Sequence, residues 1–189
     1  MSHRGYTIAD TCFLIDWSKY RYRDILFKIF RTVFVPEEVL REIKSEDTIT
    51  WISRELARDN LSLYTVSRFE IDEARRLIEI SREKPHLPSI DLPEAICLVI
   101  GRTRGYVVLT ENRGALYIPR SVDEYRDVVV WRSLELLVNA VLYSILKVDC
   151  GSPDTIFKEY MRDTLHLFPR KALEEAVERV RRYCLERRF

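Results

Sequence analysis

The chain has 189 residues, 47% of them hydrophobic and 32% charged, which is the composition expected of a soluble globular protein. Its 31 lysines and arginines almost cancel its 30 acids, so the formal net charge is +1. This balance argues against a strongly basic coat for nucleic acid, although it leaves room for a local basic patch. The first residues contain no long apolar stretch, so we expect neither a signal peptide nor a membrane anchor, and a cytoplasmic protein.

The cysteines are too widely spaced to suggest a metal site or a bridge. No two of them form a CxxC pair. Three of them fall in apolar helical patterns, where a thiol usually packs as a small hydrophobic group. We therefore expect neither a zinc site nor a disulfide among Cys12, Cys97, Cys150 and Cys184.

Short apolar runs alternate with amphipathic helices along most of the chain. The runs predict strands at residues 6–9, 33–35, 61–66, 106–109 and 128–131. The intervening patterns predict helices at 10–20, 24–30, from Pro36 onward, and at 50–59, 71–83, 92–102 and 133–146. Strands separated by helical crossovers indicate the α/β class, a three-layer α/β/α domain with a central parallel sheet.

A polar linker at residues 148–153 divides this pattern from a helical tail. Beyond it we expect helices at 154–168 and 170–188, the second with an apolar stripe facing the rest of the protein. The predicted organisation is an α/β domain at residues 1–146 and a helical C-terminal extension at 147–189.

Four acids are placed where a parallel sheet would bring them together. Asp10 and Glu111 each follow a buried strand, and ligands of open α/β sheets bind beyond the carboxyl ends of the strands. Glu42 lies two turns into the helix opened by Pro36, and Glu94 begins a helix that is apolar nearly all round. We expect these acids to meet at one edge of the sheet.

Such a cluster requires a cation, because neighbouring carboxylates repel each other and their pKa values rise. Ligands that are all oxygen favour Mg²⁺ or Mn²⁺ over zinc. With no Cys or His nucleophile nearby, the chemistry that fits is attack of a metal-activated water on a phosphodiester.

Four segments resemble, in order, the motifs of the PIN-domain family. The family has an Asp-Thr/Ser-Asn motif after the first strand, an acid after a strand–Pro–helix entry, an acid opening a buried helix, and a Thr–acid segment after the next strand. The similar segments here are Ile8–Ile15, Val35–Ile43, Pro93–Leu98 and Thr110–Gly114, within residues 5–146. Cys12 stands where the family usually has Asn, and the fourth acid aligns with either Glu111 or Asn112.

The resemblance implies a PIN-like fold and an Mg²⁺- or Mn²⁺-dependent endoribonuclease that cleaves single-stranded RNA. It also implies a possible toxin of a toxin–antitoxin pair, with an antitoxin or other protein partner and a homodimer. On this resemblance the catalytic metal ligands are Asp10, Glu42, Glu94 and Glu111, supported by Thr11, Asp91, Thr110 and Asn112. The alternative function is an inactive PIN-like module that binds RNA or a protein partner.

Each acid also has a purely structural interpretation. Asp10 suits the N-cap of the next helix, and Asp91 with Glu94 forms a capping-box pattern. Glu42 borders a core stripe, and Glu111 with Asn112 suits a turn.

Lys19, Arg21 and Arg23 alternate with tyrosines, a composition that suits phosphate contacts and base stacking, and Arg113 adjoins the fourth motif. We expect these four residues to bind RNA, with a solvated loop as the alternative. We interpret three further acids as surface or helix-dipole residues: Asp16, Glu37 and Glu38. The arginines of the last helix are interpreted as its solvated face, and His3, His86 and His166 as incidental.

Overall fold

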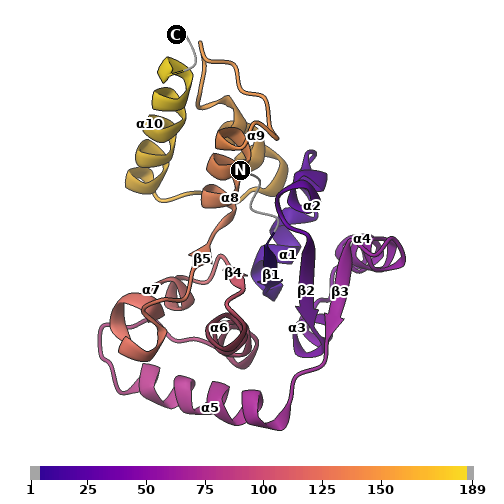
Figure 1. The fold of residues 1–189 in the computed structure, drawn as a ribbon, viewed down its shortest axis with the longest axis vertical. Helices are drawn as coiled ribbons and strands as arrows, with labels where there is room; N and C mark the ends of the chain where they lie inside the picture. The colour runs from indigo at the N-terminus through magenta and orange to yellow at the C-terminus, as the bar shows by residue number, and fades with distance from the viewer. Residues whose placement is uncertain (1–4, 187–189) are drawn as a thin grey trace.

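A computed structural model describes residues 5–186, and its centre is a five-stranded parallel sheet in the order β3-β2-β1-β4-β5 (Figure 1). The strands are β1 (Tyr6–Ala9), β2 (Thr32–Pro36), β3 (Leu61–Tyr64), β4 (Val107–Leu109) and β5 (Val130–Trp131). The chain adds strands on one side of β1 and then crosses to β4 on the other. This change of direction between β1 and β4 is where α/β sheets leave a crevice at the carboxyl ends of their strands.

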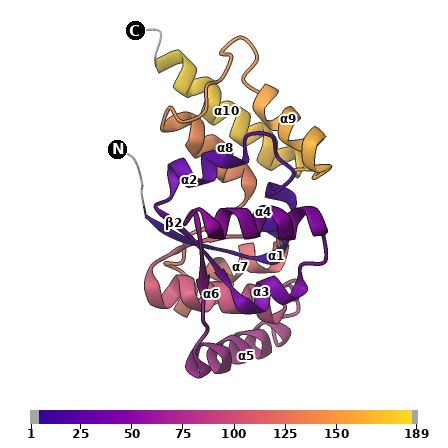
Figure 2. The ribbon, with the colours of Figure 1, turned by 90° about the vertical axis from the view of Figure 1, so that its right-hand side faces the viewer.

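Helices cover both faces of the sheet, which confirms the predicted three-layer arrangement. Helix α6, backed by α5, and helix α7 pack on one side, and α8 lies on the other (Figures 1 and 2). The helices of this part are α1 (Thr11–Trp17), α2 (Leu26–Ile29), α3 (Glu37–Glu42), α4 (Glu46–Ala57), α5 (Arg68–Arg82), α6 (Leu92–Arg104), α7 (Arg113–Ser121) and α8 (Ser133–Leu142), with 3-10 turns η1 (Arg23–Ile25) and η2 (Asp123–Tyr125).

Helix α6 lies in the middle of the core, where Ala95 to Gly101 are all buried. Gly101 is required by the close approach of α6 to the sheet, since a Cβ there would come within 2.4 Å of Val108 Cγ2. Helix α7, which contains Pro119, was not predicted. The helix nevertheless forms from a strong N-cap, in which the Asn112 side chain accepts a hydrogen bond from Ala115 N at 3.0 Å.

The extension consists of α9 (Thr155–Thr164) and α10 (Arg170–Glu186), which pack against α8 (Figure 1). Tyr160 is fully buried and its ring lies 5.8 Å from that of Trp17 and 5.1 Å from that of Tyr20. The prediction that the first of these helices continues to Phe168 was wrong, because the backbone turns left-handed at Leu165. His3 and the predicted end of the last helix at Arg188 lie outside the described residues.

The expectation of no disulfide was also wrong. Cys150, in the linker, and Cys184, near the end of α10, are joined by a disulfide with their Cα atoms 5.6 Å apart. They are separated by 34 residues, and only the return of the chain through the α9–α10 hairpin brings them together. Cys12 and Cys97 are free. None of the helices within residues 5–186 is long and apolar enough to cross a membrane.

Candidate functional site

The edge formed by the carboxyl ends of β1 and β4 places Asp10 beside Thr110. Ala9 pairs with Leu109, which in turn pairs with Trp131. The pairing continues past the strand ends, since Asp10 N donates to Leu109 O at 3.0 Å. Asp10 is therefore held by the sheet itself at the crevice between β1 and β4.

Asp10 is fully buried, and the hydrogen bonds that its carboxylate accepts from residues 5–186 come from neutral donors. Phe13 N donates to Oδ1 at 2.8 Å, which confirms that Asp10 is the N-cap of α1. The Thr110 hydroxyl donates to Oδ2. Burial raises the pKa of Asp10 to about 8, and the negative charges of Glu94 and Glu111 add to the rise. These hydrogen bonds only partly offset the cost of placing a charge here.

Glu94 reaches the same place from the first turn of α6. Its side chain accepts from Asp91 N at 3.1 Å and from Asn112 Nδ2 at 3.2 Å. Burial raises its pKa, and Asp91 and Glu42 contribute in the same direction. Within residues 5–186, Asp10, Cys12 and Glu94 form the only group of at least three His, Cys, Asp or Glu side chains whose ligand atoms all lie within 4.8 Å of one another.

Cys12 is the weak member of this group. Cys12 is an exposed residue of α1, but its thiol is partly enclosed. Desolvation raises the pKa of this thiol to about 12, and the negative charges of Asp10 and Glu94 add to the rise. A thiol that stays protonated at neutral pH is a poor metal ligand, because metals bind the thiolate. The donors that remain are carboxylate oxygens.

Glu42 is the last residue of α3, and Thr11 Oγ1 donates a hydrogen bond to its Oε2 at 3.0 Å. One turn earlier, Glu38 places Oε2 in the interior, where the described residues give it no hydrogen-bond partner. Glu38 also raises the pKa of the buried Cys97 thiol, although burial itself, Asp10 and Glu94 contribute more. Glu38 is therefore more than a surface group, and its place in the first turn of α3 agrees with the interpretation as a helix-dipole residue. The four-residue spacing from Glu42, which puts both acids on one helix face, was the available signal.

Glu111 has a different set of contacts. Its Oε1 accepts from Ser133 N at 2.7 Å, at the N-terminus of α8, and its Oε2 lies 3.3 Å from His166 Nε2. The His166 Nδ1 lies 2.9 Å from Asp16 Oδ2. Burial raises the pKa of Glu111, while Ser133 and His166 oppose that rise. Glu111 remains a predicted ligand, but it is outside the Asp10–Glu94 group, where Asn112 instead contacts Glu94.

His166 was missed by the sequence argument, which treated it as incidental. It is 150 residues from Asp16 and lies in the loop between α9 and α10, so no spacing signal linked it to the sheet edge. The hydrogen bond with Asp16 is the main cause of the raised pKa of His166, and the charge of Glu111 adds to it. The ring joins the extension to the α/β domain.

The predicted RNA-binding residues are mostly engaged within the protein. Arg21 makes two side-chain hydrogen bonds to Asp163 of α9, at 2.7 and 2.6 Å. Arg23 donates to Ser18 O, and its guanidinium lies 5.9 Å from the Trp51 ring.

The other two are less constrained. Lys19 is nearly half exposed and only 3.9 Å from Asp16. Arg113, at the start of α7, lies 5.9 Å from the Tyr117 ring centroid. Lys19 and Arg113 therefore retain a charge that a phosphate can reach, and their role in RNA binding stays a prediction.

The site fits an oxygen-coordinated divalent cation. Asp10 and Glu94 offer carboxylate oxygens at ligand spacing, and the described residues place no cationic side chain in hydrogen-bond contact with either of them. A divalent ion favours the ionised form of both acids and so relieves the cost that their raised pKa values express. Comparisons with protein-family models and with curated proteins find no match for the chain.

Proposed function

We propose that the protein is a divalent-metal-dependent nuclease that cleaves single-stranded RNA. The observation that supports this most directly is a fully buried Asp10 whose nearest ionisable neighbours include another acid, Glu94, at ligand distance. Such an arrangement is costly for a purely structural acid and favourable for a cation site. The order of the four PIN-like segments supports RNA hydrolysis as the reaction.

In this proposal Asp10 and Glu94 hold Mg²⁺ or Mn²⁺. Glu42, Glu38 and Asn112 would act through water rather than as direct ligands. Thr110 and Thr11 orient two of these acids through the hydrogen bonds described above. Mg²⁺ commonly uses one or two protein carboxylates and fills its other positions with water and substrate phosphate, so two direct ligands suffice.

When bound, the cation supplies charge stabilisation at the scissile phosphate and lowers the pKa of a water molecule. The protein's own groups position these reactants. Glu94 is held by Asp91 N and Asn112 Nδ2, which fixes the direction of its carboxylate toward Asp10. A carboxylate at this edge accepts the proton of the attacking water, and Lys19 and Arg113 contact the backbone of the RNA strand.

The wider assignment follows from the PIN resemblance. We infer that the protein is cytoplasmic. One version of the proposed function is that it is the toxin of a toxin–antitoxin pair and is bound by a protein antitoxin.

The direct test is cleavage of end-labelled single-stranded RNA with Mn²⁺, Mg²⁺ or EDTA. Wild type should cut only with metal, and Asp10→Asn should lose cutting by at least about a thousandfold because it removes a ligand. Asp127→Asn, an exposed residue before β5 at the opposite end of the strands, is the matched control and should keep full activity. An Asp10→Asn variant that cuts like wild type would exclude the proposed site.

An inactive module that binds RNA or a protein is the second candidate. It is favoured by Asn112, which occupies one of the two positions that align with the fourth acid of the family. Folded wild type with no cleavage, but with RNA retained in a gel-shift assay in EDTA, would support it. A nuclease should instead bind the metal ion and cleave many RNA molecules per protein molecule.

A further inference from the structure

The solvent-facing side of α7 carries an aromatic ring between two arginines. Arg113, Tyr117 and Arg120 follow one another at spacings of four and three residues, so they lie on one face of the helix. All three are exposed, Tyr117 to 39%, and the Arg113 guanidinium lies 5.9 Å from the centroid of the Tyr117 ring. We refer to these three residues as the α7 stripe.

The stripe begins beside the candidate cation site and is held there. Asn112 caps α7 and also donates from Nδ2 to Glu94 at 3.2 Å, and Arg113 is the next residue. Gly114 packs so closely that a Cβ there would come within 2.6 Å of the Pro88 carbonyl oxygen. The first turn of α7 is therefore fixed relative to Glu94, and a ligand bound along the stripe orders little additional backbone.

The positive charge of the stripe is not neutralised by the protein. Residues 113–121 contain no acid. Within residues 5–186 neither Arg113 nor Arg120 forms an ion pair, and Glu124, just beyond the end of α7, is already bound by Arg76 and Arg102. Two guanidinium groups on a face without acids attract phosphate.

The aromatic ring of the stripe is also available. No other aromatic ring of residues 5–186 packs on Tyr117, whose ring neighbour is Arg113. The segment 19–23 has a similar composition, but there Tyr20 is buried and Arg21 is bound to Asp163. The combination of bases and an aromatic side chain that suits an unpaired nucleic-acid strand is therefore presented to solvent on α7.

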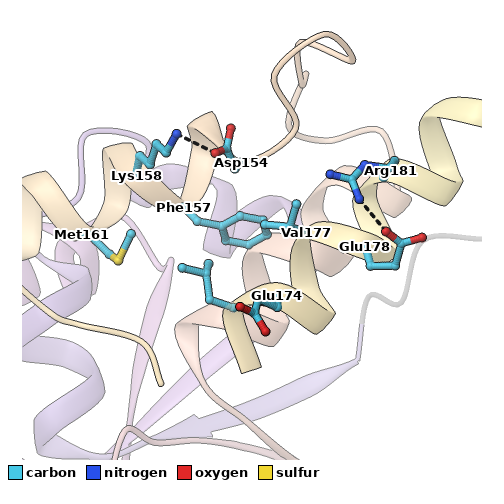
Figure 3. Close-up of a pocket in the computed structure, with 9 residues that line it drawn as sticks. Asp154, Phe157, Lys158, Met161, Glu174, Val177, Glu178 and Arg181 are labelled. Atoms are coloured by element: carbon cyan, nitrogen blue, oxygen red, sulfur yellow. Dashed lines mark hydrogen bonds and ion pairs between the residues drawn. The ribbon is translucent and has the colours of Figure 1, made fainter. Parts of the chain in front are cut away.

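The groove between α9 and α10 has the opposite character (Figure 3). Its lining includes three acids, Asp154, Glu174 and Glu178, against two bases, Lys158 and Arg181. Lys158 is bound to Asp154, and Arg181 is bound to Glu178. This groove repels phosphate, so of the two surfaces the α7 stripe is the one that suits a polyanion.

We propose that the α7 stripe binds the RNA strand next to the cation site, with an unpaired base stacked on Tyr117 and phosphates bound by Arg113 and Arg120. The proposal rests on RNA as the ligand, which the nuclease and the inactive binding module share. The two arginines are about 10 Å apart along the helix, with Tyr117 between them. A strand that contacts both arginines passes over the ring and stacks one base on it. Such stacking requires an unpaired base and tolerates any base identity, because every base has a π-face.

Fluorescence anisotropy of a short fluorescein-labelled oligouridylate tests the stacking contact. The full chain is titrated in EDTA, so that binding is measured without cleavage. Tyr117→Ala should weaken binding by at least about fivefold, because it removes the stacking surface. Tyr117→Phe and Tyr117→Trp keep an aromatic ring and should bind like wild type. With a blunt-ended RNA duplex as the probe, Tyr117→Ala should bind like wild type, since the bases are already paired.

The salt dependence of the same titrations tests the phosphate contacts. Arg120→Ala should reduce the slope of log affinity against log salt by about 0.7, because one phosphate contact of a single strand is lost. Tyr117→Ala should leave the slope unchanged. Arg31→Ala is the matched control, since Arg31 is exposed and lies 5.9 Å from the ring of Tyr6 at the amino end of β1, and it should bind like wild type. Circular dichroism confirms that each variant is folded.

An oligouridylate affinity that is unchanged in Tyr117→Ala would overturn the proposal. A wild type that does not bind oligouridylate in EDTA would also overturn it and would indicate an acidic protein surface as the ligand of the stripe. Cleavage by wild type with Mn²⁺ is measured beside these titrations. Binding that depends on the stripe without cleavage would count against the nuclease proposal alone, and cleavage with unchanged binding in the variants would count against the stripe alone.

Discussion

Two acids follow neighbouring strands of the sheet, and they differ in one partner. Glu111, after β4, faces the N-terminus of α8 through Ser133 N and has His166 at 3.3 Å. Asp10, after β1, has the Phe13 amide and the Thr110 hydroxyl as donors and Glu94 as a neighbour. Both acids therefore accept from an amide at a helix N-terminus, since Asp10 caps α1 and Ser133 begins α8, and within residues 5–186 Glu111 alone of the two also has a histidine beside it.

In the proposed function Asp10 is a ligand, and Glu111 is a structural acid that joins the extension to the α/β domain. Glu111 Oε2 lies near His166 but has no hydrogen-bond partner among the described residues, and burial still raises the pKa of Glu111, so its charge is only partly compensated. Asp10 and Glu94 lie close together, and the described residues place no positive side chain in hydrogen-bond contact with either of them, which is the electrostatic condition for a cation site. Sequence position alone suggested the same role for both acids.

The largest expected effect concerns metal affinity. Glu94→Gln should weaken Mn²⁺ binding by at least about 100-fold, because a neutral amide replaces a direct ligand. Glu111→Gln should weaken it by less than about tenfold, because Glu111 acts only at a distance. Isothermal titration calorimetry of both variants beside wild type measures this ratio. Equal losses of Mn²⁺ affinity in the two variants would show that Glu111 is a metal ligand like Glu94.

Removing the disulfide tests whether metal binding by Asp10 and Glu94 depends on the stability of the extension. A double Cys150→Ser/Cys184→Ser variant should lose about 2–4 kcal/mol of unfolding free energy, because the bridge closes a long loop. Its Mn²⁺ affinity should stay unchanged, since Asp10 and Glu94 are held by β1 and α6. Urea unfolding measures the loss, with Cys12→Ser as a control for replacing a thiol that forms no bridge. A parallel loss of metal affinity would show that the two regions are coupled.

Much of the fold was accessible from the sequence because it depends on local patterns. The apolar runs predicted the five strands, and the all-round apolar pattern of Leu92 to Arg102 predicted the buried helix α6. Helix α7 was missed because its stability depends on the Asn112 cap and on packing around Gly114, where a Cβ would come within 2.6 Å of the Pro88 carbonyl oxygen. Such tertiary contacts leave little trace in periodicity.

The site was predictable only in part for a related reason. The positions of Asp10 and Glu94 follow from parallel topology, which sequence patterns reveal. The separation of Glu111 from them depends on His166 and Ser133, which come from later parts of the chain. The disulfide between Cys150 and Cys184 has the same origin, because only the folded hairpin brings its halves together.

Removing His166 should test the compensation of Glu111. His166→Ala leaves Asp16 and the buried Glu111 without this partner, so we expect a loss of about 1–3 kcal/mol in unfolding free energy. His86→Ala, on an exposed segment, is the matched control and should change stability little. Chemical denaturation at pH 6 and 8 measures both variants. An unchanged His166→Ala would show that the α8 N-terminus alone compensates Glu111.

The smallest expected effect is a pH dependence assigned to Asp10 in the metal-free protein. Its pKa is about 8 in the folded state and about 3.9 in an unfolded chain, so between these values the folded state binds more protons than the unfolded state. Stability is then highest at the acidic end and falls as the pH rises toward 8. Asp10→Asn removes this contribution, so wild type should lose at least about 1 kcal/mol relative to the variant between pH 5 and 8. Denaturation in EDTA measures the difference, and saturating Mn²⁺ should abolish the relative loss because the bound ion favours the ionised carboxylate. If the difference in unfolding free energy between wild type and Asp10→Asn stays constant with pH in EDTA, the charge of Asp10 is already compensated within the protein. The comparison of Asp10 with Glu111 would then no longer support a cation site.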